Sequence, residues 1–122
     1  MNVLRPLVSV VDDDESVREA LPLLLRTFGL RVETFSSAES FLASENVCLT
    51  KCLFLDVAMP SMTGPELQQE LNRRGTGVPI VFITAVKDES IRQSLMQEGA
   101  VECLFKPFSE ADLAQALKSA LG

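Results

Sequence analysis

Five short runs of strand-forming residues are spaced along this chain, and amphipathic helical patterns separate them. The runs are Leu7–Val11, Arg31–Phe35, Cys52–Leu55, Ile80–Ile83 and Val101–Phe105. Continuous apolar runs of this length suit strands buried on both faces, as the inner strands of a parallel sheet are. Because strand and helix alternate five times, we expect one α/β domain with a parallel sheet, helices on both faces and right-handed crossovers.

The helical patterns have recognisable ends. They cover Val17–Phe28, Ser37–Ser44, Pro65–Arg74, Glu89–Glu98 and Leu113–Leu121. Ser109 is a suitable N-cap for the last helix, and Pro65 is expected at the first position of the third. Pro22 interrupts the first pattern and removes a backbone hydrogen bond, so we expect a kink near Arg18 or a helix that starts late.

Length, charge and cysteine content limit the function. At 122 residues the chain fits one domain, and a formal charge of −6 makes direct nucleic-acid binding unfavourable. No apolar run reaches the roughly 20 residues of a membrane helix, so we expect no membrane association. The chain has no His, and Cys48, Cys52 and Cys103 lack a fourth soft ligand for a structural zinc ion. We expect them to be reduced thiols in a cytoplasmic protein, acting as small apolar filler.

Polar side chains follow four of the five runs at the point where each ends. They are Asp12, Asp13 and Asp14 after the first run, Asp56 after the third, Thr84 after the fourth and Lys106 after the fifth. Singly, each suits a turn, a cap or a solvated surface. In a doubly wound sheet, however, the carboxyl ends of the strands form the ligand site, so we expect these side chains to meet there.

Carboxylates gathered in one place repel each other unless a cation binds among them. Hard oxygen ligands without His or Cys favour Mg²⁺. We assign Asp14 instead to capping the first helix. A carboxylate beside Mg²⁺ can attack phosphorus and form an acyl phosphate, so Asp56 is the expected acceptor. Lys106 and Thr84 can then contact the oxygens of the transferred group.

The motifs VVDDDESVR, LDVAMPSMTGPEL, VFITA and LFKPF occur in this order. From about Pro6 to Leu121 the chain resembles the response regulator receiver domain of two-component signalling, most closely the branch with a C-terminal helix-turn-helix DNA-binding domain. The resemblance implies a flavodoxin-like (βα)5 fold with strand order 2-1-3-4-5. We expect residues 1–122 to be one receiver domain and the N-terminal fragment of a longer regulator.

The resemblance also implies how the site works. Asp56 would be phosphorylated by a sensor histidine kinase, and the domain would catalyse its own phosphorylation and dephosphorylation without being a classical enzyme. Asp13, Asp56 and the backbone carbonyl of Ala58 would bind Mg²⁺, which Mn²⁺ or another divalent ion can replace. Asp12 would act mainly through metal-bound water.

Further implications concern the signal. Thr84 and Lys106 would sense the phosphoryl group, and the bond before Pro107 would be cis. Receivers commonly carry Tyr or Phe three residues before the lysine, but here that position is Cys103. Phe105 lies on the same face by strand alternation and is a possible partial substitute.

When Asp56 is phosphorylated, the face built from the fourth helix, fifth strand and fifth helix is expected to rearrange and then to form a homodimer or release an output domain. Any DNA contact would come through that attached domain.

Three other functions remain to be weighed. A phosphohydrolase of the haloacid dehalogenase type needs a second Asp where this chain has Ala58. A flavodoxin-like FMN protein needs a hydroxyl- and Gly-rich phosphate loop where this chain has three carboxylates. A pseudo-receiver used only for protein contacts is favoured by Cys103 alone, since the expected active-site positions are all present.

Overall fold

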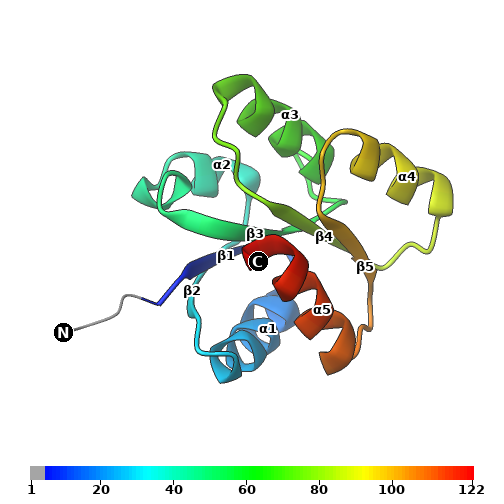
Figure 1. Cartoon of the computed structure of the whole chain (residues 1–122). Helices are drawn as coiled ribbons and strands as arrows, with labels where there is room; N and C mark the ends of the chain where they lie inside the picture. Colours follow the sequence, from blue (N-terminus) through cyan, green and yellow to red (C-terminus); the bar gives the residue numbers. More distant parts are fainter. Residues whose placement is uncertain (1–4) are drawn as a thin grey trace.

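The computed structural model describes residues 5–122 as one layered α/β unit (Figure 1). Its elements are β1 (Leu7–Val11), α1 (Glu15–Thr27), β2 (Arg31–Phe35), α2 (Ala38–Leu42), a 3-10 turn η1 (Glu45–Val47), β3 (Thr50–Asp56), α3 (Gly64–Arg74), β4 (Ile80–Thr84), α4 (Glu89–Gln97), β5 (Glu102–Phe105) and α5 (Glu110–Leu121). The five strands and five helices expected from the sequence are all present.

The sheet is parallel throughout, with the order β2-β1-β3-β4-β5. Val10 of β1 pairs with Thr34 of β2 on one side and with Phe54 of β3 on the other. Every residue of β1 and β4 is buried, whereas the edge strands β2 and β5 are partly exposed. The expected order 2-1-3-4-5 is therefore confirmed, and the continuous apolar runs mark the inner strands.

Two apolar cores lie on opposite faces of the sheet. Helices α1 and α5 cover one face and α2, α3 and α4 cover the other (Figure 1). Alternation along β3 sends Phe54 into the first core and its neighbours Leu53 and Leu55 into the second. Burying a side chain of this size contributes about 1.5–3 kcal/mol to the free energy of folding. The two cores hold the strands in place from both faces, and so they position the strand ends that carry the polar residues.

Side-chain caps define where the helices begin. Ser109 and Asp112 form a capping box at α5, as the sequence indicated. Thr63 and Glu66 form another at α3, so Pro65 occupies the second helical position rather than the expected first. Such caps are typically each worth about 1 kcal/mol, because they satisfy backbone N–H groups that have no partner in the first turn.

Pro22 does not delay the start of α1. The helix begins at Glu15, because Asp14 caps it and Arg18 N donates to the carbonyl of Asp14 at 3.2 Å. The first turn is thus complete ahead of the proline, which is buried against the core. The expectation of a late start was wrong.

The three cysteines are free thiols in different surroundings. Cys52 belongs to the core under α1 and α5, and Cys103 to the core under α2, α3 and α4. Burial raises the pKa of the Cys52 thiol to about 12. Cys48 is exposed, so it is not the core filler that we expected. Because Cys52 and Cys103 are separated by the sheet, the three thiols do not form a zinc site.

Within residues 5–122, no helix combines the length and the apolar character that crossing a membrane requires.

Candidate functional site

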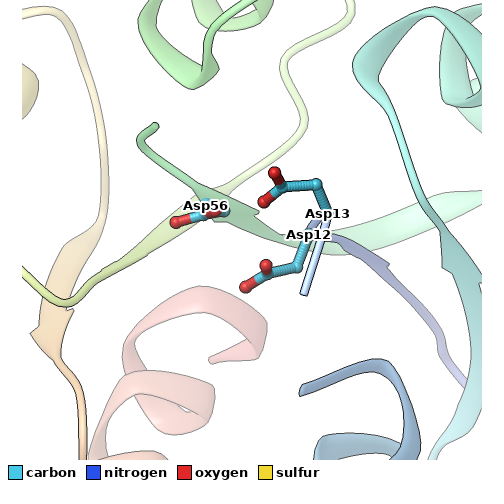
Figure 2. Close-up of side chains that lie close together, drawn as sticks. All are labelled: Asp12, Asp13 and Asp56. Atoms are coloured by element: carbon cyan, nitrogen blue, oxygen red, sulfur yellow. The ribbon is translucent and has the colours of Figure 1, made fainter. Parts of the chain in front are cut away.

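Four strand ends bring polar side chains to the carboxyl edge of the sheet. Asp12 follows β1, Asp56 is the last residue of β3, Thr84 is the last residue of β4, and Lys106 follows β5. The predicted site residues therefore meet at one edge. Figure 2 shows the three carboxylates of Asp12, Asp13 and Asp56 lying close together.

These three carboxylates each offer an oxygen within 4.8 Å of the others. Asp12 is fully buried and Asp56 is 7% exposed, whereas Asp13 is open to solvent. Hard oxygen donors at this spacing fit a divalent ion such as Mg²⁺. The exposed Asp13 leaves one side of the carboxylate cluster open to solvent.

Asp12 is held on three sides. Its Oδ1 accepts a hydrogen bond from Asp14 N at 2.9 Å, and its Oδ2 accepts one from Lys106 Nζ at 2.9 Å. The guanidinium of Arg18 donates to the backbone carbonyl of Asp12 at 2.9 Å. Arg18 was not assigned to the site from the sequence, because the position of a basic residue in the first helix does not indicate which backbone carbonyl its side chain contacts.

Asp14 is the N-cap of α1, as predicted from the sequence. Its side chain accepts hydrogen bonds from the backbone N–H and the hydroxyl of Ser16, which caps α1. The bonds from Ser16 hold the pKa of Asp14 below its ordinary value. Asp14 thus belongs to the helix end rather than to the carboxylate cluster.

Lys106 lies between two carboxylates. Its Nζ is 2.9 Å from Asp12 Oδ2 and 3.6 Å from Asp56 Oδ1. Burial by itself would lower the pKa of Lys106, but the hydrogen bond to Asp12 and the charges of Asp12 and Asp56 together raise it. The ammonium is therefore held in its charged form between the carboxylates of Asp12 and Asp56.

The carboxyl group of Asp56 has a pKa raised from 3.8 to about 7. Burial is the largest cause and the negative charge of Asp12 adds to it, while Lys106 acts in the opposite direction. One ammonium therefore does not balance the buried carboxylates, and a second cation would be favourable here. The donor set of Asp12, Asp13 and Asp56 fits a divalent ion on chemical grounds.

Thr84 is buried at the end of β4, beside the end of β3. Its Oγ1 accepts a hydrogen bond from Val86 N at 3.1 Å, and its carbonyl accepts one from Lys106 N at 2.7 Å. The Lys106–Pro107 peptide bond is cis, the isomer that the resemblance implies. Thr84 and Lys106 are thus joined through the backbone.

The loop after Asp56 passes close over the end of β3. Gly64 N donates to the carbonyl of Val57 at 3.0 Å, which closes the loop. A Cβ on Gly64 would lie 2.3 Å from the carbonyl oxygen of Asp56, so a side chain at this position would clash with the backbone. Ala58, whose carbonyl is the expected third metal ligand, is exposed within the same loop.

Cys103 occupies the position where an aromatic residue was expected. It is 4% exposed and packs in the core beneath α4, and Phe105 packs partly buried against the same core. The two side chains share a face, as alternation predicted. Glu102 of β5 also forms an ion pair with Arg92 of α4 at 2.9 Å, a link between these elements that the sequence did not suggest.

A family model described as the response regulator receiver domain matches residues 8–118. This chain belongs to that family. The response regulator protein TmoT of Ectopseudomonas mendocina is 41% identical over 99% of the chain and 55% of its own length. The transcriptional regulatory protein TdiR of Thauera aromatica is 41% identical over 93% of the chain and 50% of its own length.

Solved receiver structures are similar as well. The response regulator StyR superposes with a TM-score of 0.87 at 48% identity, covering 96% of this chain and 59% of StyR. FixJ-N superposes with a TM-score of 0.86 at 32% identity, covering 98% of this chain and 95% of FixJ-N. The receiver spans about half the length of the curated relatives that it matches.

Proposed function

We propose that this receiver is a phospho-acceptor switch and that Asp56 takes the phosphoryl group in a reaction that depends on Mg²⁺. The observation that carries the proposal is the position of Asp56, buried at the end of β3 between the carboxylates of Asp12 and Asp13 and the ammonium of Lys106. Asp12 is buried in the same cluster, but both of its carboxylate oxygens already accept hydrogen bonds, from Asp14 N and from Lys106 Nζ.

The transfer is a displacement at phosphorus. A carboxylate oxygen of Asp56 forms the new O–P bond, and the bond from phosphorus to the donor breaks. With a phosphohistidine donor, the departing imidazole nitrogen keeps the electron pair and takes a proton from water. Lys106 would contact one phosphoryl oxygen and the hydroxyl of Thr84 another, so that charge on the equatorial oxygens is neutralised.

Asp13, Asp56 and the backbone carbonyl of Ala58 would hold the divalent ion, with Asp12 acting through water. When bound, this ion neutralises charge on the carboxylates and on the transferred phosphoryl oxygens. The raised pKa of Asp56 supports this assignment, since a cation would favour the ionised nucleophile. Mn²⁺ is expected to replace Mg²⁺.

The readout of phosphorylation would begin at Thr84. Movement of its hydroxyl toward a phosphoryl group requires it to leave Val86 N, which would shift the loop into α4. Cys103 is too small to fill an aromatic slot, so Phe105 would carry part of the coupling. The rearranged α4–β5–α5 face would then dimerise or release an output domain.

The receiver would act as the N-terminal part of a longer cytoplasmic regulator, phosphorylated by a sensor histidine kinase. TdiR, whose own name describes a transcriptional regulator, is twice as long as the part that this chain matches. DNA binding would therefore belong to an attached output domain. The strongly acidic receiver itself would not bind DNA.

Incubation with acetyl phosphate tests the proposal. The receiver should gain the mass of one phosphoryl group when Mg²⁺ is present, and none when EDTA replaces the metal. Asp56→Asn should gain none under either condition. A mass gain in Asp56→Asn, or an unmodified wild-type protein with Mg²⁺, would overturn the proposal. Turnover of p-nitrophenyl phosphate would instead support a phosphohydrolase.

A further inference from the structure

Away from the acidic cluster, a pocket of about 650 Å³ opens at the edge of the sheet where the strands begin. We call it the amino-edge pocket. Its lining includes Arg5, Arg31, Lys51, Leu49, Pro79 and Leu121. Residues from the starts of three strands and from the end of α5 therefore meet here. The phosphorylation site lies at the opposite edge.

The apolar part of this pocket is left uncovered. Leu49 is 53% exposed and Leu121 is 37% exposed, and both line the same pocket as Pro79. Single exposed leucines are common on protein surfaces. Two in one hollow with a proline form a small apolar floor that could take one large side chain from a binding partner.

Three cations surround this floor. Arg5, Arg31 and Lys51 are exposed, and within residues 5–122 none of them forms an ion pair with a carboxylate. Residues 1–4 contain no Asp or Glu that could pair with them. Arg31 Nε donates to the carbonyl of Arg5 at 2.9 Å, which holds that guanidinium beside the pocket.

The described lining of the pocket carries three cations and no carboxylate, although the whole chain has a charge of −6. Helices run antiparallel to the strands, so their last turns reach the same edge. These turns carry Arg26 and Lys118, and also Arg73 and Arg74, which both pair with Glu70. The carboxyl edge, by contrast, carries the acidic cluster. An acidic partner would therefore be attracted to the amino edge and repelled from the phosphorylation site.

We propose that the amino-edge pocket binds an acidic peptide segment of a partner protein, which inserts one large apolar side chain among Leu49, Pro79 and Leu121. Arg5, Arg31 and Lys51 bind the flanking carboxylates. A nucleic acid fits less well, since the lining, as far as residues 5–122 describe it, has no aromatic residue on which a base could stack, and the chain is acidic overall. The proposal does not depend on phosphorylation of Asp56.

The probe is a short synthetic peptide in which one leucine and one phenylalanine are flanked by aspartates and glutamates. It is titrated into ¹⁵N-labelled receiver while backbone amide shifts are followed. We expect shifts at Leu49, Lys51 and Leu121, and weaker binding as salt is added. A peptide with lysines in place of the acids, one with alanines in place of the apolar pair, and N-acetylleucine should each bind at least tenfold more weakly.

Charge reversal locates the site. Arg31→Glu and Lys51→Glu should each weaken peptide binding by roughly tenfold. Arg26→Glu makes the same charge change at the same edge but outside the pocket lining. It should weaken binding less than threefold, because salt screens its long-range repulsion of the peptide. Leu49→Ser should remove the contact of the apolar anchor without loss of folding, since this side chain is already largely exposed.

Several results would overturn the proposal: absence of binding, equal binding of the basic peptide or of N-acetylleucine, or shifts confined to the carboxyl edge. Self-association of the receiver that Arg31→Glu abolishes would also overturn it, because the occupant would then be a second copy. All four variants should take up a phosphoryl group from acetyl phosphate as the wild type does, which separates this test from the one at Asp56.

Discussion

A methyl group on Gly64 would lie 2.3 Å from the backbone carbonyl oxygen of Asp56. The loop that follows Asp56 thus crosses its own strand at a distance that excludes any side chain. A Cβ would also come within 3.1 Å of the ring of Phe82, which is fully buried and cannot move aside at low cost. The end of β3 at Asp56 and the start of α3 are therefore positioned together.

Gly64→Ala should lower the free energy of unfolding by about 1–3 kcal/mol, the usual cost of overpacking, and should slow phosphorylation by acetyl phosphate. Urea unfolding and the rate of mass gain measure the two effects. Gly77→Ala is the control, since Gly77 has φ +66° and open space around it. That variant should lose about 1 kcal/mol through backbone strain alone and be phosphorylated at the wild-type rate. A Gly64→Ala protein as stable as the wild type would contradict the geometry.

Lys106→Met should leave the buried carboxylate of Asp12 without its cation. We expect a loss of about 1–3 kcal/mol in unfolding free energy at neutral pH, and slower phosphorylation. Mg²⁺ should bind more tightly, because Lys106 no longer repels the ion. Calorimetry suits this measurement, since the chain has no Trp to report binding. Lys118→Met, at the far end of α5, should leave Mg²⁺ binding unchanged; weaker Mg²⁺ binding in Lys106→Met would refute the expected repulsion.

The raised pKa of Asp56 predicts a pH dependence of stability in EDTA. Burial raises the folded-state pKa to about 7 from an ordinary value of 3.8. The folded protein then holds a proton that the unfolded chain releases, so this group's contribution to stability is present at low pH and is lost as pH rises through about 7. The free energy of unfolding of the wild type should fall relative to that of Asp56→Asn as the pH rises from 3.8 to about 7.

Mg²⁺ should reverse this loss, because it favours the ionised carboxylate. Its stabilising effect in urea unfolding should therefore be larger above the pKa of Asp56 than below it. A stability difference between wild type and Asp56→Asn that does not change with pH would contradict the assigned pKa.

Asp13 and Asp14 are adjacent but should behave differently. Asp14→Ala removes the cap of α1 and should cost about 1 kcal/mol without a large change in Mg²⁺ affinity. Asp13→Asn changes an exposed carboxylate that we propose as a metal ligand, and it should weaken Mg²⁺ binding severalfold with little loss of stability. The two variants are compared by calorimetry and urea unfolding. Equal effects on Mg²⁺ affinity would show that Asp14 belongs to the metal site.

The sequence was informative where local pattern decides structure. Alternation of apolar runs and helical patterns predicted the sheet, and Asp14 and Ser109 were recognised as caps because capping depends on neighbouring residues. Strand limits were less accurate. The apolar run of the third strand ends at Leu55, but Asp56 continues the strand because it still pairs with Ile83 of β4.

Contacts between distant residues could not be read from the sequence. Thr50 begins β3 as a buried polar residue because Ser9 of β1 lies 2.7 Å from its hydroxyl. Arg18 reaches the carbonyl of Asp12 only after α1 has docked, and Arg92 meets Glu102 only once α4 and β5 are adjacent. Such partners are set by the tertiary arrangement, which residue spacing alone does not specify.

Chemical trapping of the modified residue tests the role of Asp56 most directly. Borohydride reduces an acyl phosphate on an aspartate to homoserine, whereas an unmodified carboxylate does not react. After treatment with acetyl phosphate and Mg²⁺ and then with borohydride, the peptide containing residues 52–72 should carry homoserine in place of Asp56. Every other aspartate of the protein should be unchanged. Homoserine at position 12 or 13, or an unchanged Asp56 in protein that has gained a phosphoryl group, would contradict the assignment of Asp56 as the acceptor.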